Sequence, residues 1–468
     1  MRPLEIASAV ILFFCFIRLF FSPRPRWAEF LPAVGILIAI LQLGLEGYRW
    51  QMIPVYLLVL VVFLFSLPAL ARKAKPAGRG RWKSLTGAVA GLLATAVAVA
   101  LLVLFPIPHG PSPTGPYQVG TFSLDLTDAS RHEIYSSDPA DLRRIMVQVW
   151  YPASPAPGTL LSPWVDHTEI FGPAIARILG LPSFFLDHLK YARTNSYLDA
   201  PVSNAEPKYP VLLFSHGWTG FRTQNTYQIQ ELVSHGYIVA ALQHTYGAAV
   251  TVFPDGTIDY YNPQALPENA PADVYDAAAN RLADQWAGDL GFVLDTLTQM
   301  NAGDTRYGLK GRLDLDRVGV FGHSTGGGAA VEFCARDARC KAGLGEDAFL
   351  TPVSKSVLAA GLRQPFLFLF SEQWSHREKN VALFAQLYSH SDRSITATIL
   401  GTKHYDFTDL PLLTPIAAQL GLKGPINGKR VMMIVDDYSL SFFDRYLLGE
   451  PTTLLDGPSP QFPEVKFP

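Results

Sequence analysis

The sequence carries almost no net charge, few cysteines and no set of potential metal ligands at a recognised spacing. Its 38 lysine and arginine residues nearly balance 40 aspartate and glutamate residues, which gives a formal net charge of −2 over 468 residues. Proteins that bind nucleic acid concentrate positive charge, so this balance argues against a nucleic-acid partner. Because histidines, cysteines and carboxylates do not cluster at metal-binding spacings, we expect neither a metal nor another cofactor.

Charged residues are also scarce, at 17% of the chain, whereas 49% of the residues are hydrophobic. The hydrophobic excess is concentrated in the first hundred or so residues, where four apolar spans approach the roughly 20 residues needed to cross a bilayer. A cleaved signal peptide does not explain the first span, because no small-residue cleavage site precedes the second. The sequence therefore predicts an integral membrane protein that has the lipid bilayer as a partner. The four spans are Leu4–Phe21, Phe30–Leu45, Met52–Ala71 and Leu85–Ile107.

The basic residues between the spans predict the orientation of the chain. Arg24 and Arg26 lie between the first two spans, with Arg18 close by. Six more basic residues lie between the third and fourth spans: Arg72, Lys73, Lys75, Arg79, Arg81 and Lys83. With four spans both loops fall on one side, which the positive-inside rule makes cytoplasmic. We therefore expect the rest of the chain to face the extracytoplasmic side of the plasma (inner) membrane.

The composition changes after the fourth span. Residues 106–116 are rich in proline and glycine, which is typical of a linker. We predict a transmembrane helical region over residues 1–108, a linker over 109–116 and a globular domain over 117–468.

The globular part alternates strand-like and helical patterns. Its clearest helix covers Ala272–Met300, where apolar residues recur on one stripe. This alternation predicts an α/β fold, with a mostly parallel sheet covered by helices on both faces. The expected strands are Ile145–Tyr151, Val211–Ser215, Tyr237–Leu242, Val318–Phe321, Phe366–Phe370 and Ile395–Leu400.

One turn between a strand and a helix carries the strongest chemical signal. Residues 322–326 read Gly-His-Ser-Thr-Gly, the pattern G-x-S-x-G. In a nucleophile elbow the two glycines leave room for a strained serine whose hydroxyl projects from the turn. The alternatives are a phosphate-binding turn at a helix N-terminus and an ordinary packed corner. The flanking strand and helix favour Ser324 as the nucleophile of an α/β-hydrolase fold.

A serine nucleophile needs a base to remove its proton and an acid to hold that base. In α/β-hydrolases the chain order is nucleophile, acid, base, so the base should follow the last strand. His404 meets this condition, because it follows the strand expected at Ile395–Leu400. Four other histidines either lie in a polar helical stretch, where we expect exposed side chains, or precede the serine: His376, His390, His216 and His244.

The sequence pattern leaves the acid open. Asp347 follows the strand expected after the elbow helix, and Glu372 follows the strand Phe366–Phe370. Glu346 is a third candidate, but its side chain should point away from that of its neighbour Asp347. The general logic of the fold leaves Asp347 and Glu372 as equally good candidates.

Ester hydrolysis also needs two backbone N–H groups that bind the developing oxyanion. We expect one from Thr325, directly after the nucleophile. The second should follow an early strand, and the run Phe214-Ser215-His216-Gly217-Trp218 fits because its glycine lets the backbone come close. We therefore assign the Trp218 N–H to this role, with an ordinary turn as the alternative.

Several segments in the globular part together resemble the plasma-type platelet-activating factor acetylhydrolases. The resemblance covers roughly Gly115 to Leu448 and leaves out the four apolar spans. It rests on Val149-Trp150-Tyr151-Pro152, Trp164, Glu169-Ile170-Phe171, Tyr209–Gly217, Phe221-Arg222-Thr223, Ser234–Ala241, Gly322-His323-Ser324, Asp347-Ala348-Phe349 and Gln364-Pro365-Phe366.

The resemblance implies a calcium-independent serine esterase, a carboxylic ester hydrolase that acts on phospholipids with short or oxidised sn-2 acyl chains. It also implies Asp347, not Glu372, as the acid. Two features depart from the family: Thr325 stands where the animal enzymes are expected to have an aromatic residue, and a membrane tether replaces the secreted form. These departures bear on acyl and head-group preference, not on the type of reaction.

Other functions fit part of the pattern. One is a general carboxylesterase, either like dienelactone hydrolase or able to cleave polyesters. Another is an inactive membrane scaffold with a hydrolase fold, although the filled catalytic positions argue against it. The Phe- and Leu-rich stretch Trp164–Tyr197 would either line the acyl pocket or pack as ordinary excursion helices.

Two of the three cysteines, Cys334 and Cys340, lie in the globular part, whereas Cys15 lies in the first span. In an oxidising compartment a bond between Cys334 and Cys340 would close a short loop and contribute roughly 2 kcal/mol in the chain-entropy model. A helix can also hold two cysteines too far apart to bridge. The sequence leaves a disulfide and two free thiols equally open.

Overall fold

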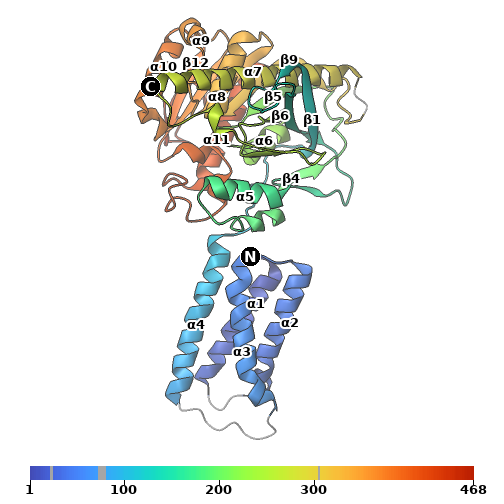
Figure 1. Ribbon diagram of the computed structural model, residues 1–468, viewed down its shortest axis with the longest axis vertical. Helices are drawn as coiled ribbons and strands as arrows, with labels where there is room; N and C mark the ends of the chain where they lie inside the picture. Colours follow the sequence, from blue (N-terminus) through green and yellow to red (C-terminus); the bar gives the residue numbers. More distant parts are fainter. Residues whose placement is uncertain (22–24, 72–80, 304–305) are drawn as a thin grey trace. The chain divides into compact units, whose positions relative to one another are not determined.

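The computed structural model describes the chain except for residues 22–24, 72–80 and 304–305 (Figure 1). The chain forms two compact units. The first contains Met1–Pro108 with Phe184–Leu189 and Leu413–Ile416, and the second contains His109–Ser183, Lys190–Leu412 and Ala417–Pro468.

The first unit contains four apolar helices, and each is long and apolar enough to cross a membrane. This confirms the four predicted spans as possible membrane helices. The last of them ends at Leu104, three residues before the predicted Ile107, because Pro106 disfavours helical geometry at the residue before it. The helices are α1 Pro3–Ile17, α2 Leu31–Leu45, α3 Ile53–Ala71 and α4 Arg81–Leu104.

The helices of the first unit pack closely together and present apolar side chains outward. A Cβ added to Gly91 of α4 would lie 2.0 Å from the Phe16 ring, so the glycine permits close packing against the end of α1. Phe65 is 72% exposed and Val97 is 70% exposed, as expected for side chains that face lipid. Arg24, Arg72, Lys73, Lys75 and Arg79, on which the predicted orientation depends, lie outside the described residues.

The second unit is built around one sheet. Among the described residues its strand order is β13-β12-β11-β10-β9-β5-β6-β2-β1-β4-β3. Neighbouring strands are parallel from β6 through β5, β9, β10 and β11 to β12. The pairs β1–β2, β2–β6, β3–β4 and β12–β13 are antiparallel, and β1–β4 is parallel. The predicted mostly parallel sheet is therefore confirmed.

The bounds of the strands are as follows. In the large sheet they are β1 Gln118–His132, β2 Leu142–Ala153, β3 Leu161–Pro163, β4 Arg193–Leu198, β5 Tyr209–Ser215, β6 Ile238–Gln243, β9 Leu313–His323, β10 Cys340–Glu346, β11 Phe366–Ser371, β12 Ser394–Ile399 and β13 Val465–Lys466. A separate two-stranded sheet contains β7 Val250–Val252 and β8 Ile258–Tyr260.

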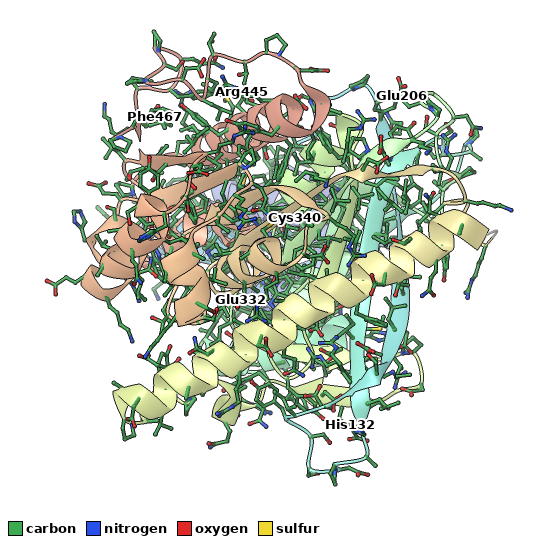
Figure 2. All side chains as sticks on the ribbon, turned by 90° about the horizontal axis from the view of Figure 1, so that it is seen from above. His132, Glu206, Glu332, Cys340, Arg445 and Phe467 are labelled. Carbon is green, nitrogen blue, oxygen red and sulfur yellow. A yellow bond between two sulfur atoms is a disulfide. The ribbon has the colours of Figure 1, made fainter. Side chains whose placement is uncertain are left out.

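Helices cover both faces of the large sheet. They are α5 Thr168–Ile178, α6 Thr226–Ser234, α7 Ala272–Gly303, α8 Thr325–Arg336, α9 Lys355–Ala360, α10 Glu378–Ser389 and α11 Gly428–Phe443. The predicted helix Ala272–Met300 is confirmed as most of α7, the long yellow helix that crosses the strands in Figure 2.

Alternation along the central strands divides the core into two layers. Val211 and Leu213 of β5 point to one face, where they join the core formed by α7 and α8. Leu212 and Phe214 point to the other face, where they join the core formed by α6 and α11. The alternation therefore fixes the sheet between two helical layers and places the carboxyl ends of β5, β9, β10 and β12 at one edge.

Several strands were not predicted, among them β1 at the antiparallel side of the sheet. Phe122 and Leu124 of β1 are buried, whereas Ser123 and Asp125, which alternate with them, are exposed. From Phe122 onward this strand lacks the continuous apolar run of the central strands, because only one of its faces packs against the core there.

A disulfide joins Cys334 of α8 to Cys340 at the start of β10. The two residues are six positions apart, so the bond closes the short connection between helix and strand. Figure 2 labels Cys340 at this connection. The structure thus decides in favour of the disulfide, which the sequence left open.

Candidate active site

Ser324 stands between β9 and α8 in a strained backbone conformation, with φ 56° and ψ −120°. A Cβ on Gly326 would lie 2.0 Å from the Ser215 carbonyl oxygen, and one on Gly322 would lie 2.4 Å from the Gly326 carbonyl oxygen. Both positions therefore require glycine. The turn is held by the Ser324 N–H, which donates to the Glu346 carbonyl over 2.9 Å, and strain of this kind costs about 1–3 kcal/mol.

His404 and Asp347 lie in contact. The distance from His404 Nδ1 to Asp347 Oδ2 is 2.9 Å, although the residues are 57 positions apart in the chain. Asp347 follows β10 with a φ of 45° and is fully buried. Its carboxylate also accepts hydrogen bonds from the Ser371 N–H over 2.6 Å and the Ser371 hydroxyl over 2.7 Å. The carboxylate is therefore held in a fixed orientation toward the imidazole.

The two other acid candidates point elsewhere. Glu372 is exposed and accepts a hydrogen bond from the Gly401 N–H over 2.7 Å. Glu346 is buried and accepts hydrogen bonds from the Asn225 and Gln228 side chains. Among the three carboxylates considered, Asp347 alone contacts His404 in the described residues.

Sequence reasoning missed the side chains that hold His404. Trp374 stacks on its ring at 4.3 Å with an interplanar angle of 11°. His323, the residue before the serine, has its Nε2 2.9 Å from the His404 carbonyl oxygen and its ring 4.4 Å from the His404 ring. Gln373 accepts a hydrogen bond from the His404 N–H over 3.2 Å. Only His323 carried a signal in the sequence, through its place inside the G-x-S-x-G pattern.

Burial controls the protonation of this pair. It lowers the pKa of His404 below its ordinary value, and the exposed Arg377 guanidinium lowers it further. The resting imidazole is therefore neutral, as a base must be. Burial also raises the pKa of the Asp347 carboxyl, while the hydrogen bonds from Ser371 act in the opposite direction.

The two proposed oxyanion donors, the Thr325 and Trp218 N–H groups, belong to segments that adjoin the serine. Thr325 is the first residue of α8, where a backbone N–H has no intrahelical acceptor. Gly217, directly before Trp218, comes so close that an added Cβ would lie 3.3 Å from the Ser324 Cβ. Among the described residues, the Trp218 N–H has no hydrogen-bond partner.

The remaining sequence candidates have other surroundings. His376 and His390 are exposed, as predicted. His216 and His244 are fully buried under the loop that carries Trp218. In the part of the chain that the structure describes, His, Cys and carboxylate residues form no group of three that could hold a metal ion.

The stretch Trp164–Tyr197 is divided between the two units, because Phe184–Leu189 belongs to the first. Trp164 donates its ring N–H to Asp409 over 2.7 Å, and its ring lies 5.8 Å from that of Phe221. Phe171 of α5 contacts the same Phe221 ring at 4.7 Å. A role of this stretch in lining an acyl pocket stays a prediction.

The mostly parallel sheet and the strained serine between β9 and α8 define an α/β-hydrolase-like protein. Residues 107–450 match the family described as platelet-activating factor acetylhydrolase, isoform II. The chain belongs to this family and is a carboxylic ester hydrolase, which confirms the resemblance seen in the sequence.

The similarity to known proteins extends over most of the chain. Platelet-activating factor acetylhydrolase of Cavia porcellus is 28% identical over 359 residues, which is 72% of this chain and 78% of the relative. A probable 1-alkyl-2-acetylglycerophosphocholine esterase of Arthroderma benhamiae is 26% identical over 413 residues, 81% of this chain and 98% of the relative. A solved ferulic acid esterase from Streptomyces cinnamoneus is 30% identical with a TM-score of 0.63, covering 77% of this chain and 99% of that one.

Proposed function

We propose that the chain is a membrane-anchored serine esterase that removes short or oxidised acyl chains from the sn-2 position of phospholipids. The observation that supports this most strongly is the 2.9 Å contact between His404 Nδ1 and Asp347 Oδ2, next to the elbow that carries Ser324. The family match and the names of the animal and fungal relatives support the phospholipid substrate. No metal or other cofactor takes part in the proposed reaction.

The first half of the proposed reaction transfers the acyl group to the enzyme. Ser324 Oγ attacks the ester carbonyl carbon while His404 Nε2 takes the hydroxyl proton. Asp347 accepts the Nδ1–H of the imidazole, holds the reactive tautomer and stabilises the imidazolium. The Trp218 and Thr325 N–H groups bind the oxyanion. When the tetrahedral intermediate collapses, the bond to the leaving alkoxide breaks and His404 returns the proton to it.

The second half uses the same groups on water. His404 takes a proton from a water molecule, whose oxygen attacks the acyl carbon bound to Ser324. Collapse of the second intermediate breaks the bond to Ser324 Oγ, which recovers its proton from His404. The products are the short fatty acid and the free serine.

The proposal divides the chain into a membrane region over residues 1–108, a linker over 109–116 and a catalytic domain over 117–468. The four apolar helices would anchor the enzyme in the plasma (inner) membrane. The basic residues between them favour an extracytoplasmic catalytic domain. The substrate would then be lipid of the outer leaflet or lipid released into that compartment.

The likeness to a ferulic acid esterase, at 30% identity over 99% of that chain, favours a second candidate: a carboxylesterase that acts on other esters. A substrate panel separates the two. The proposed function predicts the highest kcat/KM for a phospholipid with an sn-2 acetyl group, above methyl ferulate and p-nitrophenyl acetate. Higher values for the ferulate or the nitrophenyl ester would support the second candidate.

The catalytic serine is tested with Ser324→Ala. We expect esterase activity to fall by about 10⁴-fold to 10⁶-fold and labelling by a fluorophosphonate probe to disappear, because the nucleophile is gone. The protein should still fold and insert in the membrane. Ser196→Ala is the matched control, since Ser196 is fully buried, contacts Gln230 away from the site, and should keep both activity and labelling. Labelling that persists in Ser324→Ala would identify another serine as the nucleophile.

A further inference from the structure

The N–H of Trp218 shares one peptide unit with the carbonyl of Gly217. A peptide unit is planar and trans, so its N–H and C=O point in opposite directions. Whatever fixes the Gly217 carbonyl therefore also fixes the direction of the Trp218 N–H. This matters because an oxyanion donor acts only when it is already aimed at the place where the charge develops.

Two donors hold the Gly217 carbonyl. His216 Nδ1 lies 2.7 Å from its oxygen, and the Gly220 N–H donates to the same oxygen over 2.9 Å. We propose that His216 is a positioning residue of the oxyanion hole, which aims the Trp218 N–H by hydrogen bonding to the carbonyl of the same peptide unit. This inference rests on the proposed function, because it takes the Trp218 N–H as an oxyanion donor.

The surroundings of His216 fix its proton on Nδ1. The His244 backbone N–H donates to His216 Nε2 over 3.1 Å, so Nε2 must be the unprotonated nitrogen. Burial, with His244 adding to it, lowers the pKa of His216 well below its ordinary value, so the ring stays neutral. A neutral ring whose Nε2 accepts a hydrogen bond carries its proton on Nδ1, where it can be donated to Gly217.

His244 is itself held by a buried network. Its Nδ1 lies 2.8 Å from Asp289 Oδ2, and its Nε2 lies 2.9 Å from the Ser215 hydroxyl. The Trp286 ring stacks on it at 4.2 Å with an interplanar angle of 5°. Asp289 is paired with Arg143 over 2.6 Å, so its buried charge is neutralised. The network holds His244 in place, and the His244 backbone N–H in turn holds the His216 ring.

The backbone of the loop after His216 is restricted at Thr219 and Gly220. A Cβ on Gly220 would lie 2.1 Å from Gln224 Oε1 and 2.8 Å from the Gly217 oxygen, so this turn requires glycine. Thr219, within the turn, has a positive φ of 56°. The loop is therefore a strained turn, and hydrogen bonds to its carbonyl oppose its relaxation.

The test compares two amides at one position. His216→Asn places an amide nitrogen where Nδ1 stands, whereas His216→Gln places it nearer to Nε2, out of reach of the Gly217 carbonyl. We expect kcat of the Asn variant within about threefold of wild type and kcat of the Gln variant lower by about 10-fold to 100-fold, with KM little changed. The substrate is p-nitrophenyl acetate, so the result does not depend on the natural lipid.

Activities are measured on the full chain and expressed per active site, titrated to completion with a fluorophosphonate, so that misfolded molecules are not counted. Tyr151→Phe is the control outside this network, because it removes a buried hydrogen bond from the Tyr151 hydroxyl to the Ala200 carbonyl and leaves both donors on Gly217. It should keep kcat within about threefold of wild type, since the oxyanion donors stay aimed. Equal kcat values for the Asn and Gln variants, or a change in KM alone, would overturn the positioning role. If Ser324→Ala stays active, the proposed function itself fails, whereas an inactive Ser324→Ala with equal Asn and Gln variants rejects only this inference.

Discussion

Asp347 and Glu372 follow neighbouring strands of the same sheet, but their carboxylates contact different groups. Asp347→Asn keeps the size of the side chain and favours the wrong imidazole tautomer, so we expect kcat to fall by about 10⁴-fold. Glu372→Gln is the matched control, because Glu372 accepts a hydrogen bond from Gly401 and should change kcat little. Steady-state kinetics on titrated enzyme distinguishes them, and reversed effects would assign the acid role to Glu372.

Arg377 provides a test of the electrostatics around the base. Its guanidinium lies over the Trp374 ring at 4.4 Å, and that ring stacks on His404. Among the described residues, the other titratable groups that contact His404 are Asp347, the neutral His323 and Tyr405, whose ring lies 5.5 Å from that of His404. Because a nearby cation disfavours the imidazolium, Arg377 lowers the pKa of His404. The charge is exposed to solvent, so the effect should be small.

We therefore expect Arg377→Gln to raise the pKa of the base and to move the acid limb of kcat/KM to higher pH by about a few tenths of a unit. A pH–rate profile measures this shift. Lys379→Gln is the control, since Lys379 pairs with Asp276 and should leave the acid limb in place. An acid limb that moves to lower pH in Arg377→Gln would contradict the argument.

Different residues of the site were predictable to different degrees. Ser324 and His404 could be proposed from the sequence, because a glycine pattern and chain order point to their places. Asp347 could not be separated from Glu372 by strand logic, because the direction of its side chain depends on a single positive φ of 45°. The link from His216 to His244 and Asp289 could not be predicted, because it joins residues far apart in the chain.

At the scale of elements, the disulfide ties the end of α8 to the start of β10, whereas the elbow precedes α8 and Asp347 follows β10. Removing it with Cys334→Ala and Cys340→Ala together should lower the free energy of unfolding by about 2 kcal/mol, because the unfolded chain gains the entropy of a short loop. Denaturant unfolding of the purified full chain measures this. Neither cysteine contacts Ser324, His404 or Asp347 among the described residues, so kcat should not change.

Reduction provides the matched control for the disulfide. Dithiothreitol under unfolding conditions should lower the stability of the wild type to that of the double variant and leave the double variant unchanged. A double variant as stable as the oxidised wild type would show that the bond does not contribute to stability.

The elements themselves were predictable where both faces of a strand are buried. The buried runs in β5, β6, β9 and β11 were all found, as was the partly buried β12, with ends shifted by a few residues. Strands such as β1 were missed because half of their residues are polar and exposed, and the short β13 pairs at only two positions. Apolar content therefore predicted the centre of the sheet better than its edges.

At the scale of the whole molecule, the proposed orientation can be tested with protease. Because two separate basic loops favour the cytoplasm, a tag after Pro468 should be digested in sealed, right-side-out spheroplasts. A tag inserted between Lys75 and Pro76 is the control and should be digested only after lysis. The opposite pattern would place the catalytic domain in the cytoplasm. The disulfide is consistent with the proposed side, since such bonds persist in oxidising compartments.

The buried trio of Ser215, His244 and Asp289 has a consequence for recognising enzymes by shape. It joins the same three residue types as the proposed site, through contacts of 2.9 Å and 2.8 Å. A search that compares only side-chain geometry with a template would return this trio. All three side chains are fully buried, so neither substrate nor water can reach the hydroxyl. In the proposed catalytic trio Ser324 and His404 are partly exposed, so access to the hydroxyl distinguishes that trio from this buried one.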